Sequence, residues 1–553
     1  MKYLKWLSKA IRPYWAPVTV MMVCHVLIAS CSIGFVYVSK KLVDVAVAIF
    51  GGEPAGLGIW PWAGAMIAIT VLRILFNALR SYLQTKTEIR LKNGLRHRLF
   101  DILLHLQTDG GARHHSGDVL NRMQEDVRVV SNAVAVSVPN LFGTLLQFVA
   151  ALVFLLILDL RLALVVVAVV PVGVAAGKFI TSRIRSLTLD IRKSDSRVQA
   201  HVQESIQHIT LIQSLEHTGA SASELLGLQN ILYGNELKRT RFSIVSRIFI
   251  SLAFSAGHAI AFIWGVSGIS TGTVTYGMMT AFLQLVGQIQ RPIVEMSSQI
   301  PSIIHATASI DRLLELEALP REDVSEQILI EGTAGVRLSD ICFAYPDSER
   351  DVLHHFSHDF KPGSRTAIVG PTGVGKSTLI RLLLTLLRPR SGSIDIYAGH
   401  DAISGMDSAG KSIPLTPALR CNMAYVPQGN TLFSGTIREN LLMGDPEASQ
   451  ERLEWALHTS AADFVSDLPD GMDTQCFEAG GGLSEGQAQR IAIARTLLRP
   501  GTILLLDEFS SALDAETEKA LMERLTAALP DHTMIFITHR ERIIDYCDSV
   551  LRF

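Results

Sequence analysis

Six apolar stretches of about 20 residues constrain this chain more than any other feature of its sequence. They lie near residues 16–38, 58–80, 135–158, 161–181, 247–270 and 276–298. Each is long enough to cross the hydrocarbon core of a bilayer as a helix, and a single helix satisfies its own backbone there. Across the 553 residues, 48% are hydrophobic and only 18% are charged, which is typical of a membrane protein with an attached soluble part. We therefore expect an all-α domain of six spans over residues 1–318.

Two polar tracts between these spans are rich in basic residues. One tract lies between the second and third spans and contains Lys86, Arg90, Lys92, Arg96 and Arg98. The other lies between the fourth and fifth spans and contains Arg183, Arg185, Arg192, Lys193 and Arg197. Basic residues gather on the cytoplasmic side of a membrane, so both tracts and both termini are expected in the cytoplasm. Each tract, with its flanking spans, predicts two long helices that extend beyond the bilayer and meet at a turn. We assign the chain to a bacterial inner membrane.

The composition changes after the sixth span. Residues 319–334 are charged, include Pro320 and predict a linker. From residue 335 to 553, short apolar segments ("TAIVG", "IDIY", "MAYVPQ", "TILLLDE", "TMIFITH") alternate with helical ones, which predicts an α/β domain on a mainly parallel sheet. The net charge of -2 argues against a nucleic-acid partner, and the six spans exclude a soluble ATPase acting on nucleic acid.

The segment "GPTGVGKST" follows one of these strands and precedes a helix, which is the context of a phosphate-binding P-loop. In such a loop the glycines allow backbone N–H groups to surround the phosphates. Lys376 can then reach the β- and γ-phosphates, and the Ser377 hydroxyl can hold Mg²⁺. The candidate nucleotide-binding residues of this loop are Gly370, Thr372, Gly373, Gly375, Lys376, Ser377 and Thr378.

Two further strand ends carry candidate catalytic groups. The strand in "TILLLDE" ends in Asp507, which can serve Mg²⁺, and in Glu508, which can polarise an attacking water. The strand in "FITH" ends in His539, which we expect to reach a γ-phosphate. Together with the P-loop they predict ATP hydrolysis with Mg²⁺.

A helix that begins after "GGGLSEGQ" has an exposed, glycine-lined start. Ser484 and Gln487 form a capping-box pattern, whereas Gly486 in the first turn costs helix stability. A bare helix N-terminus favours an anion, because its N–H groups and dipole face it.

The P-loop, "VPQ", "LSEGQ", "LLLDE", "SALD" and "ITH" occur in an order that resembles ATP-binding cassette proteins, and the membrane half resembles fused half-transporters of the exporter type. The resemblance implies a dimer with two ATP molecules sandwiched between two cassettes. It also implies that Tyr345 stacks on adenine and that Gln428 touches Mg²⁺ and the attacking water. Asp514, in "SALD", would communicate across the dimer. Ser484, Gly486 and Gln487 would face the γ-phosphate held by the other subunit's P-loop.

Glu485 departs from the family, which usually has glycine at that position. An acid directed at the triphosphate would weaken one ATP site, whereas an acid directed away would complement the helix dipole. We favour the second orientation. We also favour a homodimer, although pairing with a different half-transporter stays open.

Several polar residues fall inside the predicted spans, namely His25, Arg73, Gln147, His258 and Gln284. Such groups are costly in a bilayer and either line a cavity or bond to neighbouring helices. The otherwise apolar spans favour an amphipathic, drug-like, lipid-like or peptide cargo. We expect a transporter that exports or flips it by alternating access. An importer on the same frame and an ATP-gated channel are the alternatives.

Overall fold

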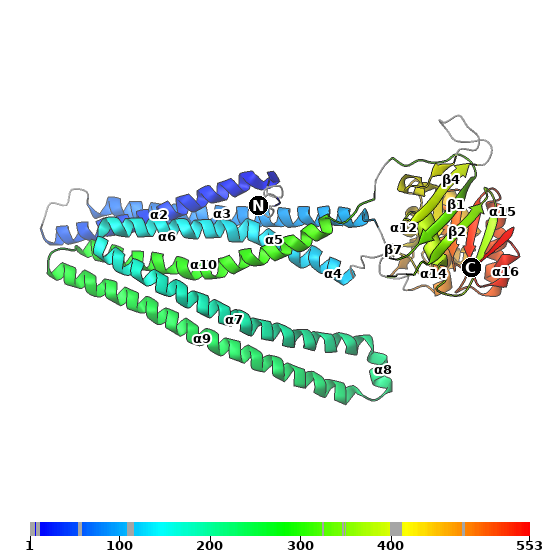
Figure 1. Cartoon of the computed structure of the whole chain (residues 1–553). Helices are drawn as coiled ribbons and strands as arrows, with labels where there is room; N and C mark the ends of the chain where they lie inside the picture. The colour runs from blue at the N-terminus through cyan, green and yellow to red at the C-terminus, as the bar shows by residue number, and fades with distance from the viewer. Residues whose placement is uncertain are drawn as a thin grey trace. The chain divides into compact units, whose positions relative to one another are not determined.

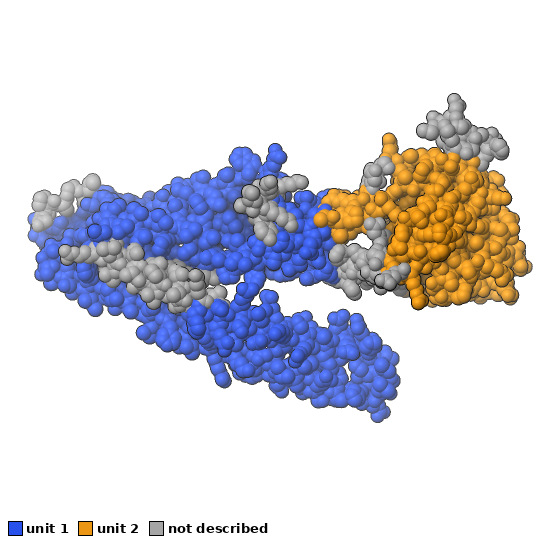
Figure 2. All heavy atoms as spheres, in the orientation of Figure 1, with its two compact units in different colours: residues 1–100, 117–317 blue, residues 101–116, 318–553 orange. Residues whose placement is uncertain are grey.

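The computed structural model describes residues 6, 12–52, 58–107, 116–322, 326–345, 348, 350–398, 412–477 and 482–553. For residues 116–117, 161–178, 181, 293–294 and 297–298 it describes the backbone alone. The chain divides into two compact units (Figure 2). Unit 1 holds residues 1–100 and 117–317, and unit 2 holds residues 101–116 and 318–553.

Unit 1 is built from helices. Their bounds are α2 (Trp15–Phe50), α3 (Ile59–Leu104, whose last turn belongs to unit 2), α4 (Ser116–Asn121), α5 (Val127–Asn132), α6 (Val138–Leu158), α7 (Leu160–Gln207), α8 (Ile209–Ser214), α9 (Thr218–Ser270) and α10 (Tyr276–Glu317). Two π-helical turns, Arg122–Asp126 and Ala133–Ser137, join α4, α5 and α6. Figure 1 shows α7 and α9 side by side and joined through α8, which confirms the pair of long helices predicted around the second basic tract.

The apolar core of unit 1 lies where α2, α6 and α10 pack along one another. Its members come from all three helices and include Val36, Ala151, Leu155, Phe282, Leu285 and Ile289. By contrast α3 and α9 carry many exposed large apolar side chains, as expected of helices that face lipid or another chain.

A polar contact with α2 holds the start of α10. Asp44 on α2 accepts a hydrogen bond from the backbone N–H of Gly277 at 2.9 Å. A carboxylate at a helix N-terminus satisfies a free N–H and complements the dipole. A Cβ at Gly277 would lie 2.2 Å from the Lys40 carbonyl oxygen, so only glycine fits this contact.

Four helical segments among the described residues are long and apolar enough to cross a membrane: Arg12–Phe50, Ile59–Leu104, Asp118–Leu158 and Thr218–Ser270. They contain the first, second, third and fifth predicted spans. The fourth and sixth spans lie in α7 and α10, where several side chains are outside the described residues. The six-span topology therefore stays a prediction.

Unit 2 contains two main sheets and the helices that cover them. An antiparallel sheet has the order β2 (Leu353–Phe360), β1 (Ala334–Phe343), β4 (Ser391–Ala398), β5 (Ile413–Pro414). A parallel sheet has the order β11 (Ser549–Arg552), β3 (Arg365–Val369), β10 (Thr533–Ile537), β9 (Ile503–Asp507), β6 (Met423–Val426). The short pair β7 (Gly435–Thr436) and β8 (Gln475–Cys476) completes the strands described, and the helices are α11 (Lys376–Leu383), α12 (Ile437–Leu442), α13 (Gln450–Thr459), α14 (Glu485–Leu497), α15 (Ala515–Ala528) and α16 (Glu541–Ile544).

The parallel sheet confirms the α/β prediction and places the candidate site. Both β9 and β10 are buried at every residue, because α14 and α15 cover one face and α11 with the antiparallel sheet covers the other. The segments "TAIVG", "MAYVPQ", "TILLLDE" and "TMIFITH" become β3, β6, β9 and β10. In contrast "IDIY" lies in β4, which belongs to the antiparallel sheet. The carboxyl ends of β3, β9, β10 and β6 meet at one edge.

Part of the predicted linker is held against the rest of unit 2. Arg321 forms a β-bridge with Leu106, just after α3. Glu322 makes a two-pronged ion pair with Arg420, with oxygen–nitrogen distances of 2.7 and 3.0 Å. The composition predicted a linker here, but it could not predict the contacts with Leu106 and Arg420.

Candidate functional site

The P-loop follows β3 and ends at the start of α11. Gly373 and Gly375 have φ angles of 89° and 109°, a backbone conformation that favours glycine. Lys376 is 6% exposed, and its Nζ donates to the carbonyl oxygens of Gly370 at 2.5 Å and Pro371 at 3.0 Å. The ammonium group therefore lies over the loop that would surround the phosphates.

Asp507 ends β9 and lies beside the P-loop. Its carboxylate is buried, and the hydroxyls of Ser377 and Tyr425 lie near enough to stabilise its charge. Burial raises the pKa of Asp507, with a further contribution from the neighbouring Glu508 charge. Burial and the Asp507 charge also raise the pKa of Tyr425 to about 12. Tyr425 was not singled out from the sequence, where it is one more aromatic residue in an apolar strand.

Glu508 follows Asp507 and gathers two other predicted catalytic residues. Its carboxylate accepts a hydrogen bond from Nε2 of Gln428, and its Oε1 lies 3.5 Å from Nε2 of His539. His539 Nε2 is also 3.2 Å from Nζ of Lys376. The backbone of Glu508 is left-handed, with φ of 46°, and such strain in a non-glycine residue is typical of functional sites.

Two other predicted P-loop residues, Thr372 and Thr378, lie on either side of Lys376 in the sequence. Thr372 is exposed in the loop, and Thr378 is buried in the first turn of α11. The hydroxyl of Tyr345 is 3.1 Å from Oγ1 of Thr378, which places this aromatic ring beside the P-loop helix. The proposed stacking of Tyr345 on adenine stays a prediction.

The start of α14 has the predicted capping box. Ser484 Oγ accepts from the Gln487 N–H at 3.2 Å, and Gln487 Oε1 accepts from the Ser484 N–H at 2.9 Å. Packing also requires glycine at position 486, because a Cβ there would lie 2.7 Å from the Ala512 carbonyl oxygen. Glu485 is exposed and makes no hydrogen bond or ion pair within the described residues, so its orientation stays open. The glycines at positions 480 and 481 lie outside the described residues.

Two residues connect this helix to the catalytic strand end. Gln489 is 1% exposed; its amide donates to the Glu508 carbonyl oxygen at 3.2 Å and accepts from the Ala512 N–H at 3.4 Å. Asp514 caps α15, because its carboxylate accepts the N–H groups of Glu516 and Thr517. The sequence motifs predicted Asp514 as a site residue. They did not predict Gln489, because a glutamine two residues after Gln487 belongs to no motif that marks it as functional.

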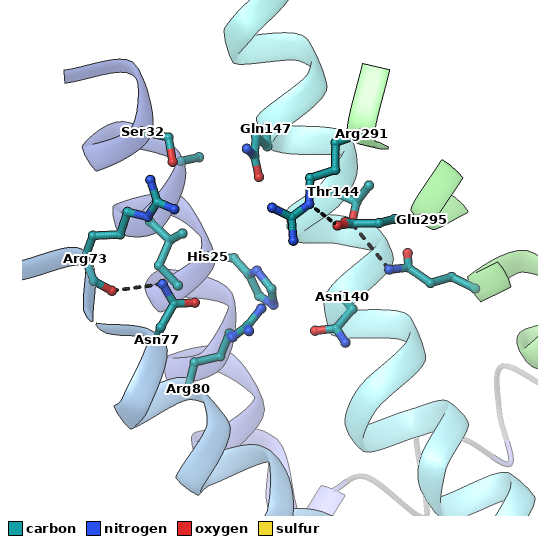
Figure 3. Close-up of a pocket in the computed structure, with 14 residues that line it drawn as sticks. His25, Ser32, Arg73, Asn77, Arg80, Asn140, Thr144, Gln147, Arg291 and Glu295 are labelled. Carbon is teal, nitrogen blue, oxygen red and sulfur yellow. Dashed lines mark hydrogen bonds and ion pairs between the residues drawn. The ribbon is translucent and has the colours of Figure 1, made fainter. Parts of the chain in front are cut away.

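A polar cavity of about 310 Å³ lies in unit 1 between α2, α3, α6 and α10 (Figure 3). His25, Arg73 and Gln147, three of the polar residues predicted in the spans, line it. The other two lie elsewhere. His258 lines a second cavity between α9 and α10, and Gln284 donates to the Ser39 hydroxyl at 3.0 Å.

Comparison with known proteins agrees with both units. The family model of the ABC transporter transmembrane region matches residues 18–293, and the family model described as ABC transporter matches residues 353–511. The chain belongs to the ABC transporter family. Its membrane domain is fused to the cassette, so it is a half-transporter of the exporter type, as the sequence motifs predicted.

Relatives of this ABC half-transporter include two bacterial proteins that match over most of their length. A putative multidrug export ATP-binding/permease protein of Bacillus subtilis is 27% identical over 568 residues, covering 100% of this chain and 94% of the relative. An ATP-dependent lipid A-core flippase of Pseudomonas fluorescens is 30% identical over 499 residues, covering 88% and 80%. The structure of a bacterial Atm1-family ABC exporter with ATP bound superposes with a TM-score of 0.79, at 25% identity over 98% of this chain and 93% of that one. The ABC half-transporter is thus an ATP-binding, multi-pass transport ATPase.

Proposed function

We propose that this ABC half-transporter works as a homodimer that binds ATP with Mg²⁺ at two equivalent composite sites. In this proposal each site joins the P-loop of one chain to the Ser484–Gln487 helix start of the other. Hydrolysis drives the export or flipping of an amphipathic cargo. Six spans carry the transport path, and both termini face the cytoplasm.

The observation that carries the proposal is the convergence of Lys376, Glu508 and His539 at one edge of the parallel sheet. Glu508 accepts a hydrogen bond from Gln428 and lies near His539, so its carboxylate is held in one place. A fixed carboxylate beside a P-loop suits the activation of a water molecule that attacks the γ-phosphate. Lys376 would hold the phosphates, and His539 would contact the γ-phosphate.

The side chains beside the P-loop can supply the oxygen ligands that Mg²⁺ needs. The Ser377 hydroxyl, the Asp507 carboxylate and the Gln428 amide all offer oxygen, which is the ligand type that Mg²⁺ prefers. One protein carboxylate is enough, because Mg²⁺ in such sites keeps water and binds the phosphates of the substrate. When bound, Mg²⁺ neutralises charge on the phosphate oxygens.

Two arguments support the homodimer and the cargo class. Identical subunits with two-fold symmetry form the commonest oligomers, and this chain supplies Lys376, Glu508 and His539 to each site. The relatives are named for multidrug export and for lipid A-core flipping, both of which concern amphipathic or apolar molecules. The many exposed apolar side chains of α3 and α9 suit a path that is open to such molecules.

The test compares the wild-type chain with Glu508→Gln in lipid nanodiscs. Removal of a general base costs about 10²- to 10⁴-fold in rate, so turnover should fall by that factor while ATP binding persists and the closed dimer accumulates. Lys376→Ala should instead weaken ATP binding. Glu516→Gln, an exposed glutamate on α15, is the matched control and should keep the wild-type rate. Hydrolysis at the wild-type rate by Glu508→Gln would show that the assigned role is wrong.

A further inference from the structure

We propose that the polar cavity of unit 1 binds an anionic headgroup of the phosphate type, carried by an amphiphile. This inference rests on the proposed transport function and names the cargo class more narrowly. Figure 3 shows Arg73 and Arg80 reaching the cavity from α3 and Arg291 from α10. Against these three guanidinium groups the lining contains a single carboxylate, that of Glu295, so the cavity has an excess of two positive charges.

The carboxylate is already engaged. Glu295 Oε1 lies 2.9 Å from Nε of Arg291, and Glu295 Oε2 accepts from the Thr144 hydroxyl at 3.3 Å. The side chains of Arg73 and Arg80, by contrast, make no hydrogen bond or ion pair with the described residues. Nε of Arg80 and Nε2 of His25 are buried there without a partner. Polar atoms that are buried without a partner are costly inside a membrane domain, and such groups mark functional sites.

The six predicted spans supply little negative charge of their own. Glu295 is the single acidic residue in the six predicted spans. A second copy of the chain would bring only its own Glu295, together with its own Arg291. Glu295 attracts Arg80 but is also paired with Arg291. An anion bound from outside the protein would supply the remaining counter-charge.

The lining chemistry selects the kind of anion. Planar guanidinium groups match the geometry of phosphate and bind it through two hydrogen bonds each. Side-chain amides of Asn77, Asn140 and Gln147 add donors around the same space, as Figure 3 shows. A volume of about 310 Å³ holds a headgroup, and two excess positive charges suit a dianion such as a phosphate monoester.

A second cavity explains why the anion should be part of an amphiphile. This cavity, of about 770 Å³, also uses Arg291 and Glu295 but is otherwise lined by Phe254, Gly287 and a few polar residues of α9 and α10. Most of the exposed surface of this lining is apolar, and it includes the ring of Phe254. A molecule that places its headgroup among the arginines thus has apolar surface within reach for a hydrocarbon part.

The experiment measures binding without ATP, to the full dimer in phosphatidylcholine nanodiscs. The probes are oleoyl lysophosphatidic acid, oleoyl lysophosphatidylcholine with the same chain, and inorganic phosphate. Lysophosphatidic acid should bind at least about 10-fold more tightly than the other two, because a hydrogen bond to a charged group is worth about 10- to 100-fold. Arg80→Gln should remove that preference by the same factor.

Two further variants keep the result interpretable. Arg73→Gln changes an exposed side chain, so it remains informative if Arg80→Gln does not fold. Arg90→Gln is the matched control on the same helix α3; its side chain is exposed and outside the cavity, so binding should not change.

Equal affinity for the two lysolipids, or an unchanged preference in both arginine variants, would overturn the proposal. Inorganic phosphate binding as tightly as lysophosphatidic acid would overturn its amphiphile part. Arginine-dependent binding in a preparation that lacks ATP turnover would support the anion site and count against the proposed function alone.

Discussion

Gly143→Ala should destabilise the membrane domain through a clash with His25. Gly143 on α6 lies against His25 on α2, and a Cβ there would fall 1.9 Å from Nδ1 and 2.5 Å from Cε1 of the ring. Neither distance is tolerated, and His25 is only 6% exposed, so the ring or the helices must move. Overpacking of a tight contact costs about 1–3 kcal/mol of unfolding free energy.

A double-mutant cycle separates this clash from a general effect of alanine. In Gly143→Ala/His25→Ala the ring is absent, so the two changes should be non-additive by about 0.5–3 kcal/mol. The double variant should therefore melt at a higher temperature than Gly143→Ala alone. Gly227→Ala on α9 is the control, because a Cβ there meets nothing within 4 Å; it should gain up to about 1 kcal/mol from helix propensity.

The assay is thermal unfolding of the purified dimer in nanodiscs, followed by intrinsic fluorescence. Two results would refute the reasoning. One is a Gly143→Ala protein as stable as the wild type. The other is a double variant whose loss of stability equals the sum of the single losses, since that would mean that the two side chains do not compete for the same space.

Three further predictions concern the dimer, the nucleotide site and the sidedness. The chain expressed alone should form a dimer that hydrolyses ATP, and Glu485→Gly should raise its rate only modestly; activity that requires a second half-transporter would contradict the homodimer. Burial and the Glu508 charge raise the pKa of Asp507 in the folded protein, so folding disfavours its charged form. In the unfolded chain Asp507 loses its proton near pH 3.9, so the nucleotide-free protein loses stability as the pH rises from about 3.9 through the raised pKa. Asp507→Asn should therefore raise the melting temperature at pH 7, with no gain below about pH 3.9, and a lower melting temperature at pH 7 would be inconsistent with this linkage. In a cysteine-free background, single cysteines at Ala55 and Thr273 should react with an impermeant thiol reagent in intact cells and one at Asp195 should not; the reverse pattern would invert the topology.

The parts of the fold that sequence predicted best are those with local signals. The strands β9 and β10 are continuous apolar runs because they are buried on both faces, and the P-loop combines glycines with Lys376 at a fixed spacing. The antiparallel sheet was not predicted as a sheet of its own. Only two of the eight residues of β2, Leu353 and Phe360, are buried, and the segment LHHFSHDF gives no clear alternation of apolar and polar residues.

The membrane cavity was predicted only in part, for a physical reason. His25, Arg73 and Gln147 stood out because polar residues in an apolar helix are conspicuous. Arg80 lies at the end of its span, where an arginine can reach the interface, and Arg291 lies in the more polar part of α10. Helical periodicity gives the face of a residue on its own helix but not the helix it meets, so the convergence of four helices needed the structure.

Transport itself tests the central claim most directly. Proteoliposomes that contain the purified dimer would be loaded with fluorescent lysophosphatidic acid in the outer leaflet and given ATP outside, where only outward-facing cassettes can use it. We predict ATP-dependent movement of the probe to the inner leaflet by the wild type, reduced to the protein-free rate in Glu508→Gln. Equal movement in the two proteins, or none that depends on ATP, would contradict an exporter driven by hydrolysis at Glu508.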